Sequence, residues 1–198
     1  MACVTSFRII TKHFALLRQA LTNKSLYVNH KHLSRTERPF LKLAREGRRA
    51  WASNSKVDTA DHLFNYCITA HSLRDWCIKH LSIPKKEFHE VCNTYERLKW
   101  CRDIANSSKH FGLMADKKST VSKVNDIKDE LVTITPDGQT SSTTHSRDSF
   151  IIEKSNGESE LLMMFLFYSF SNWEEILDKY QIPRYPDSLK TEMFIEFT

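Results

Sequence analysis

Apolar residues recur at helical spacing over several long stretches of the chain. Between residues 58 and 81 they form a stripe with a 3.6-residue period, which predicts a long helix with Asp58 as its N-cap. A short turn follows, and Pro84 suits the first turn of another helix, which runs to about Phe111 and stops before Gly112. Because the turn is short, the two helices are expected to pack antiparallel.

Three further stretches predict helices. Residues 158–180 are apolar on all sides in their first half, which is typical of a central core helix, and Pro183 and Pro186 are expected to end the regular structure. Residues 7–21 and 39–51 predict two shorter helices nearer the N-terminus. The helical stripes also predict which side chains are buried: Phe64, Cys67, Trp76, Tyr95, Leu98, Phe165 and Trp173.

A small β-hairpin is expected before the last long helix. Residues 131–135 and 149–154 alternate between apolar and polar positions, and a Pro-Asp-Gly turn follows the first of them. The charged residues 117–130 are expected to be irregular or weakly helical, and the Ser/Thr-rich residues 139–147 to be mobile. The fold class is thus mostly α, an antiparallel helical bundle with a β-hairpin inserted at about 115–156.

Charge divides the chain into two parts. Residues 1–56 contain twelve Lys or Arg against two acidic residues, a balance of +10, whereas residues 57–198 have a balance of −5. This predicts a basic helical extension, 1–56, on a helical domain, 57–198. Such an extension fits binding to RNA or another polyanion, and it equally fits a solvated face that keeps the protein in solution. Candidate nucleic-acid-binding residues on its second helix are Arg45, Arg48 and Arg49.

Composition excludes several classes of protein. Four glycines leave no room for a glycine-rich nucleotide-binding loop, and the longest apolar run is about half of what a bilayer crossing needs. Five cysteines without a C-x-x-C motif indicate buried thiols in a reducing compartment, and no secretory signal is visible. A cytoplasmic protein without a membrane partner is therefore expected. The alternative is a mitochondrial transit peptide, since residues 1–36 contain no Asp or Glu.

The most informative polar pattern lies near the end of the 84–111 helix. Arg102, Asn106 and His110 follow one another at four-residue spacing and share a helical face. Projected backwards, this face passes through Phe88, Cys92 and Tyr95, so a polar group continues an apolar stripe. The stripe fits a semi-buried groove or interface, and it also fits a helix end whose Arg or His is paired with nearby carboxylates.

A helical hairpin with an Arg, a polar residue and a following His resembles the HEPN superfamily (higher eukaryotes and prokaryotes nucleotide-binding). Arg102-Asp103 and His110 stand in the corresponding order, and the stretches DTADHLFNYCITAHSLRDW, CRDIANSSKHFGL and IIEKSNGESELLMMFLFYSF resemble uncharacterised bacterial helical proteins of this kind. The resemblance covers residues 58–113 and 149–180. It implies a cleft at a two-fold homodimer interface and a metal-independent endoribonuclease, in a toxin or phage-defence setting, with an antitoxin as a possible protein partner.

The resemblance also implies roles for the residues of this stripe. His110 would be the general acid or base and Arg102 would hold the phosphate, while Asn106 would orient one of them. Asp103 and Lys109 would assist, and Lys99 joins Lys109 as a candidate nucleic-acid contact. Neither a cofactor nor a metal ion is expected.

Three alternatives stay open. Seven residues separate Arg102 from His110, where the family has four to six, which favours a non-catalytic HEPN-like binding protein. A second pair, Arg74-Asp75 with His80, has the family's spacing, although a six-residue step turns a helix by about 240°. Finally, a zinc site is conceivable from two pairs of side chains across the turn: Cys77, His80, His89 and Cys92.

Overall fold

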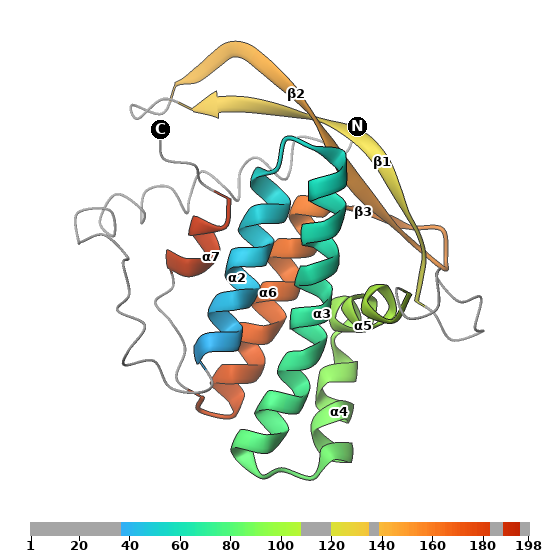
Figure 1. Cartoon of the computed structure of the whole chain (residues 1–198), viewed down its shortest axis with the longest axis vertical. Coiled ribbons are helices and arrows are strands. Elements are labelled where there is room, and N and C mark those ends of the chain that lie inside the picture. The colour runs from blue at the N-terminus through green and yellow to red at the C-terminus, as the bar shows by residue number, and fades with distance from the viewer. Residues whose placement is uncertain (1–36, 108–119, 135–138, 183–187, 195–198) are drawn as a thin grey trace.

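The computed structural model describes residues 37–107, 120–134, 139–182 and 188–194. Three long helices lie side by side in it: α2 (Glu37–Ala52), α3 (Lys56–Leu81) and α6 (Leu162–Lys179), with α2 antiparallel to the other two (Figure 1). These confirm the helices predicted for 39–51, 58–81 and 158–180, with small shifts at the ends of the first two. The start of the third is wrong, because Ser159–Leu161 form a short strand and the helix begins at Leu162. The predicted 7–21 helix lies outside the described residues.

Helix α6 is the centre of the core, as its sequence predicts. Its Phe165, Phe170 and Trp173 are fully buried. Phe40 of α2 stacks on Phe170 with ring centroids 4.6 Å apart, and the hydroxyl of Tyr66 from α3 bonds the Ser169 hydroxyl at 2.8 Å. Residues 37–52 of the expected N-terminal extension are thus part of the bundle.

The long helix predicted for 84–111 is wrong in one respect, because the structure breaks it in two. Helix α4 (Lys85–Thr94) runs back along α3, and α5 (Glu96–Ser107) starts anew after Tyr95, whose backbone is extended with φ −93° and ψ 112°. Asn93 and Thr94 favour such a break, since short polar side chains compete for backbone hydrogen bonds. The Thr94 hydroxyl does so by donating to the Val91 carbonyl at 2.7 Å.

The start of α3 also differs from prediction. The N-cap is Ser55 and not Asp58: the Ser55 hydroxyl accepts from the backbone N–H of Asp58 at 3.4 Å. Asp58 lies in the first turn instead, where a negative charge is favourable beside the helix dipole. Ser82 ends the helix in the left-handed conformation, φ 52°.

The β-hairpin is present and is much longer than predicted. Strand β1 (Val121–Ile134) pairs antiparallel with β2 (Thr140–Lys154), and the short β3 (Ser159–Leu161) adds to the other edge of β2. Residues 121–130 are therefore strand and not irregular, and 140–147 belong to β2 and not to a mobile loop. The hairpin crosses one end of the bundle (Figure 1). The full length of the hairpin was not predicted because the sequence of β1 is highly charged. These charges are paired in the structure: Lys56 with Asp126, and Lys128 with Asp148 at 2.5 Å.

Two smaller findings complete the fold. A short helix, α7 (Ser188–Glu192), lies beside α2 after the two prolines that were expected to end regular structure. Cys67, Leu98, Phe165 and Trp173 are buried as predicted, and Phe64 and Tyr95 are partly buried, but Trp76 is 43% exposed, so its predicted burial is wrong. Across the described ranges, no helix combines the length and apolar character that a membrane span requires.

Candidate functional site

The predicted site on α5 is held by one carboxylate. Arg102 donates from Nε and Nη2 to Oδ1 of Asp103 at 2.9 and 2.8 Å. The other oxygen of Asp103 accepts from the backbone N–H and the hydroxyl of Thr120, both at 2.7 Å. Asp103 therefore ties α5 to the residue before β1 and neutralises Arg102, an arrangement that first of all stabilises the fold.

The rest of the predicted site is split. Asn106 lies one turn beyond Arg102 on the same side of α5 and is partly buried, as is Lys99, three residues before Arg102. His110 and Lys109 lie outside the described residues. The backward projection of the stripe through Phe88 and Cys92 is wrong, because the break at Tyr95 places those residues on a separate helix.

The second predicted pair, Arg74-Asp75 with His80, does not come together, as the turn of about 240° between Arg74 and His80 indicates. His80 and Asp75 are exposed, whereas Arg74 turns inward and is almost completely buried. Arg74 donates to the Leu98 carbonyl at 3.0 Å and to Oδ1 of Asn93 at 3.2 Å. It thereby bridges the α4–α5 break, and burial lowers its pKa because desolvation disfavours the charged guanidinium.

The four side chains of the zinc alternative do not gather into a metal site. Cys77 and Cys92 are buried, and burial raises the pKa of Cys77 to about 12 and that of Cys92 to about 11. Both thiols belong to the apolar core of the bundle, as is usual for structural cysteines. In the described part of the chain no group of His, Cys, Asp and Glu side chains could hold a metal ion.

Four exposed Lys and Arg side chains lie on one face of α2, which is separated from α5 by α3 (Figure 1). Lys42, Arg45 and Arg49 follow Arg38 at steps of four, seven and eleven residues, so the four lie within about 60° of one helical face. All four are exposed. We call them the α2 basic stripe.

The charge of this stripe is largely unpaired. Arg49 donates to Oε1 of Glu46 at 2.9 Å, and its side chain remains 55% exposed. No carboxylate of the described residues forms an ion pair with Arg38, Lys42 or Arg45. Arg48 lies about 90° from the centre of this stripe, on the flank of α2 that faces α7, where it donates to the Glu192 carbonyl at 3.1 Å.

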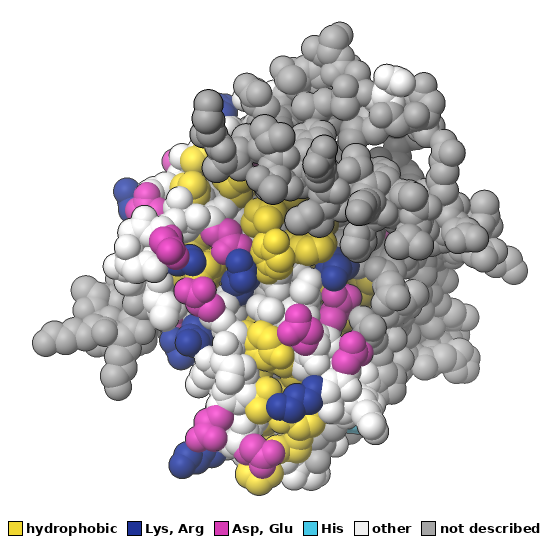
Figure 2. All heavy atoms as spheres, turned by 180° about the vertical axis from the view of Figure 1, so that it is seen from behind, with side chains coloured by type: hydrophobic (Ala, Val, Ile, Leu, Met, Phe, Trp, Pro, Cys, Tyr) yellow, Lys and Arg dark blue, Asp and Glu magenta, His cyan; other side chains and the backbone are white. Residues whose placement is uncertain are grey.

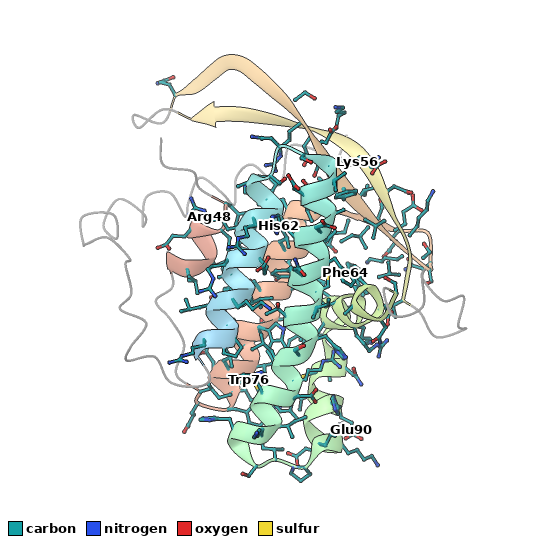
Figure 3. The ribbon with its side chains drawn as sticks, viewed as in Figure 1. Arg48, Lys56, His62, Phe64, Trp76 and Glu90 are labelled. Atoms are coloured by element: carbon teal, nitrogen blue, oxygen red, sulfur yellow. The ribbon has the colours of Figure 1, made fainter. Side chains whose placement is uncertain are left out.

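The stripe borders directly on α3. Oε2 of Glu46 lies 3.4 Å from Nδ1 of His62, so one carboxylate, with a side chain 8% exposed, lies between Arg49 and an α3 imidazole. Nδ1 of His62 is buried, while the side chain as a whole is 30% exposed. Figure 3 shows His62 where α2 and α3 meet, with Trp76 further along α3.

No family model, no curated protein and no solved structure matches the chain. The HEPN resemblance, the two-fold dimer and the antitoxin partner accordingly stay predictions.

Sequence reasoning found part of the α2 basic stripe and missed the rest. It singled out Arg45 and Arg49 by their place on an outer helix face, but it left out Arg38 and Lys42. The spacing of four, seven and eleven residues was the available signal. His62 had none, because its position beside Glu46 depends on how α2 and α3 pack.

Proposed function

We propose that the protein binds RNA through the α2 basic stripe. The observation that carries this proposal is the alignment of Arg38, Lys42, Arg45 and Arg49 on one exposed face, three of them without a described carboxylate partner. The stripe spans about 16 Å along α2, given a rise of 1.5 Å per residue. Regularly spaced guanidinium and ammonium groups suit the phosphates of a nucleic-acid backbone, which supply most of the sequence-independent affinity.

The alternative is that the α2 basic stripe only keeps the protein in solution. This alternative fits the stripe poorly, because other surfaces of the molecule carry mixed charges. On the reverse side, Figure 2 shows acidic and basic side chains interspersed. Cations near α5 are paired: Arg97 bonds Glu160 at 2.8 Å and Lys154 bonds Glu158 at 2.8 Å. Mixed charges are sufficient for solubility, so a run of one sign favours binding to a polyanion. The choice of RNA is supported by the HEPN resemblance.

The experiment compares two triple variants that lose the same charge. One replaces Arg38, Lys42 and Arg45 with Gln. The control replaces Lys86, Lys123 and Lys179, exposed lysines of α4, β1 and α6, with Gln. Binding of a labelled RNA is followed by fluorescence anisotropy over a series of salt concentrations.

The stripe variant is expected to bind RNA weakly and to respond less to salt. Plots of log K against log salt have a negative slope, and loss of three phosphate contacts should make this slope less steep by about 2. The control should stay close to wild type in both slope and affinity. An equal loss of RNA affinity in the two variants would show that only the net charge matters, which would overturn the proposal. Wild-type protein that binds no RNA would overturn it as well.

A further inference from the structure

Trp76 is an exposed aromatic ring on a helix face that is otherwise polar. It is 43% exposed, whereas Trp100 and Trp173 are fully buried. Indole offers a large apolar area, so leaving it in water forgoes the stabilisation that burial gives. An exposed ring of this kind is a common feature of binding surfaces.

Trp76 belongs to a definite stripe of α3. His62, Asn65, Thr69, Ser72 and Trp76 follow at steps of three or four residues and lie within about 80° of one face. We call these five residues the α3 polar stripe. Its five residues include no carboxylate, but Glu46 of α2 lies 3.4 Å from His62, and Asp58 lies one turn before His62 on the same face. Thr69 is buried, so the exposed side chains of this stripe are Asn65, Ser72 and Trp76.

The two stripes are neighbours, and the Glu46–His62 contact fixes how they lie. Because α2 and α3 are antiparallel, the chain from Glu46 back to Arg38 and the chain from His62 on to Trp76 run in the same direction. Arg38 lies about 12 Å from the level of that contact and Trp76 about 21 Å, at 1.5 Å per residue. The ring is therefore about 9 Å beyond the last cation of the α2 basic stripe.

We propose that the face formed by the α2 basic stripe and the α3 polar stripe binds single-stranded RNA, with a base stacked on Trp76. This rests on the proposed function and adds the form of RNA that the site takes. Phosphates follow the cations of α2, and the next base along the strand meets the indole. Ribose hydroxyls and base edges meet the exposed Asn65 and Ser72 of α3.

The requirement for a single strand follows from the ring. In a duplex, each base face is covered by its neighbours, so an aromatic side chain on an open helix surface has no base to stack on. An unpaired base offers its face, and stacking on an aromatic ring is favourable for every base. A groove of cations with an aromatic platform is accordingly suited to single strands without a fixed sequence.

The test separates stacking from phosphate binding. Wild type, Trp76→Leu and Trp76→Phe are titrated with a labelled oligouridylate and with an RNA duplex of the same length. Val57→Ala serves as a matched control, because Val57 is an exposed apolar residue of α3 that lies off the polar stripe. Melting temperatures verify that each variant is folded.

Trp76→Leu should weaken binding of the single strand by about tenfold, given the usual size of one stacking interaction. Trp76→Phe should retain most of the affinity, and the affinity for the duplex should not change. Binding should quench tryptophan fluorescence in wild type and much less in Trp76→Phe, because Trp100 and Trp173 are buried and the fourth tryptophan, Trp51, is partly buried with the Arg147 guanidinium over its ring.

Each other outcome has a definite meaning. Unchanged single-strand affinity in Trp76→Leu overturns the stacking and leaves RNA binding by α2 intact, which would assign the ring to another kind of partner, such as a protein. Equal loss for single strand and duplex overturns it as well. Wild-type protein that binds neither RNA overturns the proposed function itself.

Discussion

Oε2 of Glu46 lies 3.4 Å from Nδ1 of His62, while the other oxygen of the same carboxylate accepts from Arg49 at 2.9 Å. A single buried side chain thus links α2 to α3 and takes up part of the charge of the α2 basic stripe. The same group stabilises the helix pair and opposes a bound phosphate. Stability and RNA affinity should therefore respond to its charge in opposite directions.

Glu46→Gln tests this opposition, because it removes the charge and keeps the size of the side chain. The free energy of unfolding should fall by roughly 1 kcal/mol, as expected for a weakened charge-assisted hydrogen bond. RNA affinity should rise by up to about fivefold, since Arg49 is released and a partly exposed ion pair contributes no more than about 1 kcal/mol. Urea denaturation and anisotropy measure the two quantities.

Glu90→Gln is the control, because Glu90 is exposed on α4 and the change in net charge is the same. It should alter neither quantity appreciably. RNA affinity that falls or stays constant in Glu46→Gln would show that Arg49 contributes nothing to binding.

Phe40→Ala examines whether α2 is part of the core. Phe40 is 3% exposed and stacks on Phe170, so the truncation should lower the free energy of unfolding by about 3–5 kcal/mol. Arg45→Ala, on the exposed side of the same helix, should change it by less than about 0.5 kcal/mol. A small effect of Phe40→Ala would mean that α2 is peripheral to the bundle.

The long helices could be predicted from the sequence because their burial is periodic. In α3 and α6, the apolar spacing alone identifies helices and most buried positions, and Cys67, Phe165 and Trp173 are where the stripes place them. The break at Tyr95 could not be predicted in this way. Besides the local effect of Asn93 and Thr94, it is bridged by Arg74, which reaches from α3 to the Leu98 carbonyl, a contact between residues far apart in sequence.

Strand β1 and the exposure of Trp76 also could not be predicted from the spacing of apolar residues. Strand β1 contains Lys123, Asp126 and Lys128, so its pattern resembles a charged loop, and only pairing with β2 makes it a strand. Trp76 fits an apolar helical stripe by residue type alone. Whether a neighbouring helix covers it is decided by packing, which the sequence pattern does not contain.

The candidate site was predictable to the extent that its residues belong to one helix. The cations of α2 share a single helical face, so their alignment can be read from spacing. The link to His62 requires two helices to be placed against each other. Asp103 illustrates the same point: its bonds to Thr120 give it a structural role that its position beside Arg102 does not indicate.

Arg74→Met should weaken the junction of α4 and α5. Methionine keeps most of the length and the apolar stem but removes the two hydrogen bonds that Arg74 donates to the Leu98 carbonyl and to Asn93. Relief of the buried charge offsets part of this loss, and the net decrease in the free energy of unfolding should be about 2 kcal/mol. Lys79→Met, an exposed position on the same helix, should have little effect. A variant as stable as wild type in urea denaturation would show that Arg74 does not hold the junction.

The endoribonuclease implied by the HEPN resemblance can be tested separately from binding, because its residues lie on α5 and beyond while the proposed binding face lies on α2 and α3. If the prediction holds, purified protein cleaves RNA in the presence of a chelator and leaves a cyclic phosphate end. His110→Ala and Arg102→Ala should then each lower the rate by a factor of roughly 10² to 10⁴.

Arg102→Ala should keep its melting temperature, because Asp103 retains both of its bonds to Thr120 when the guanidinium is removed. RNA binding should persist in both variants, since the α2 basic stripe is untouched. Wild-type protein that binds RNA and never cleaves it would contradict the catalytic prediction and favour the non-catalytic alternative, in which Asp103 joins α5 to Thr120 before β1 and Arg102 only pairs with Asp103.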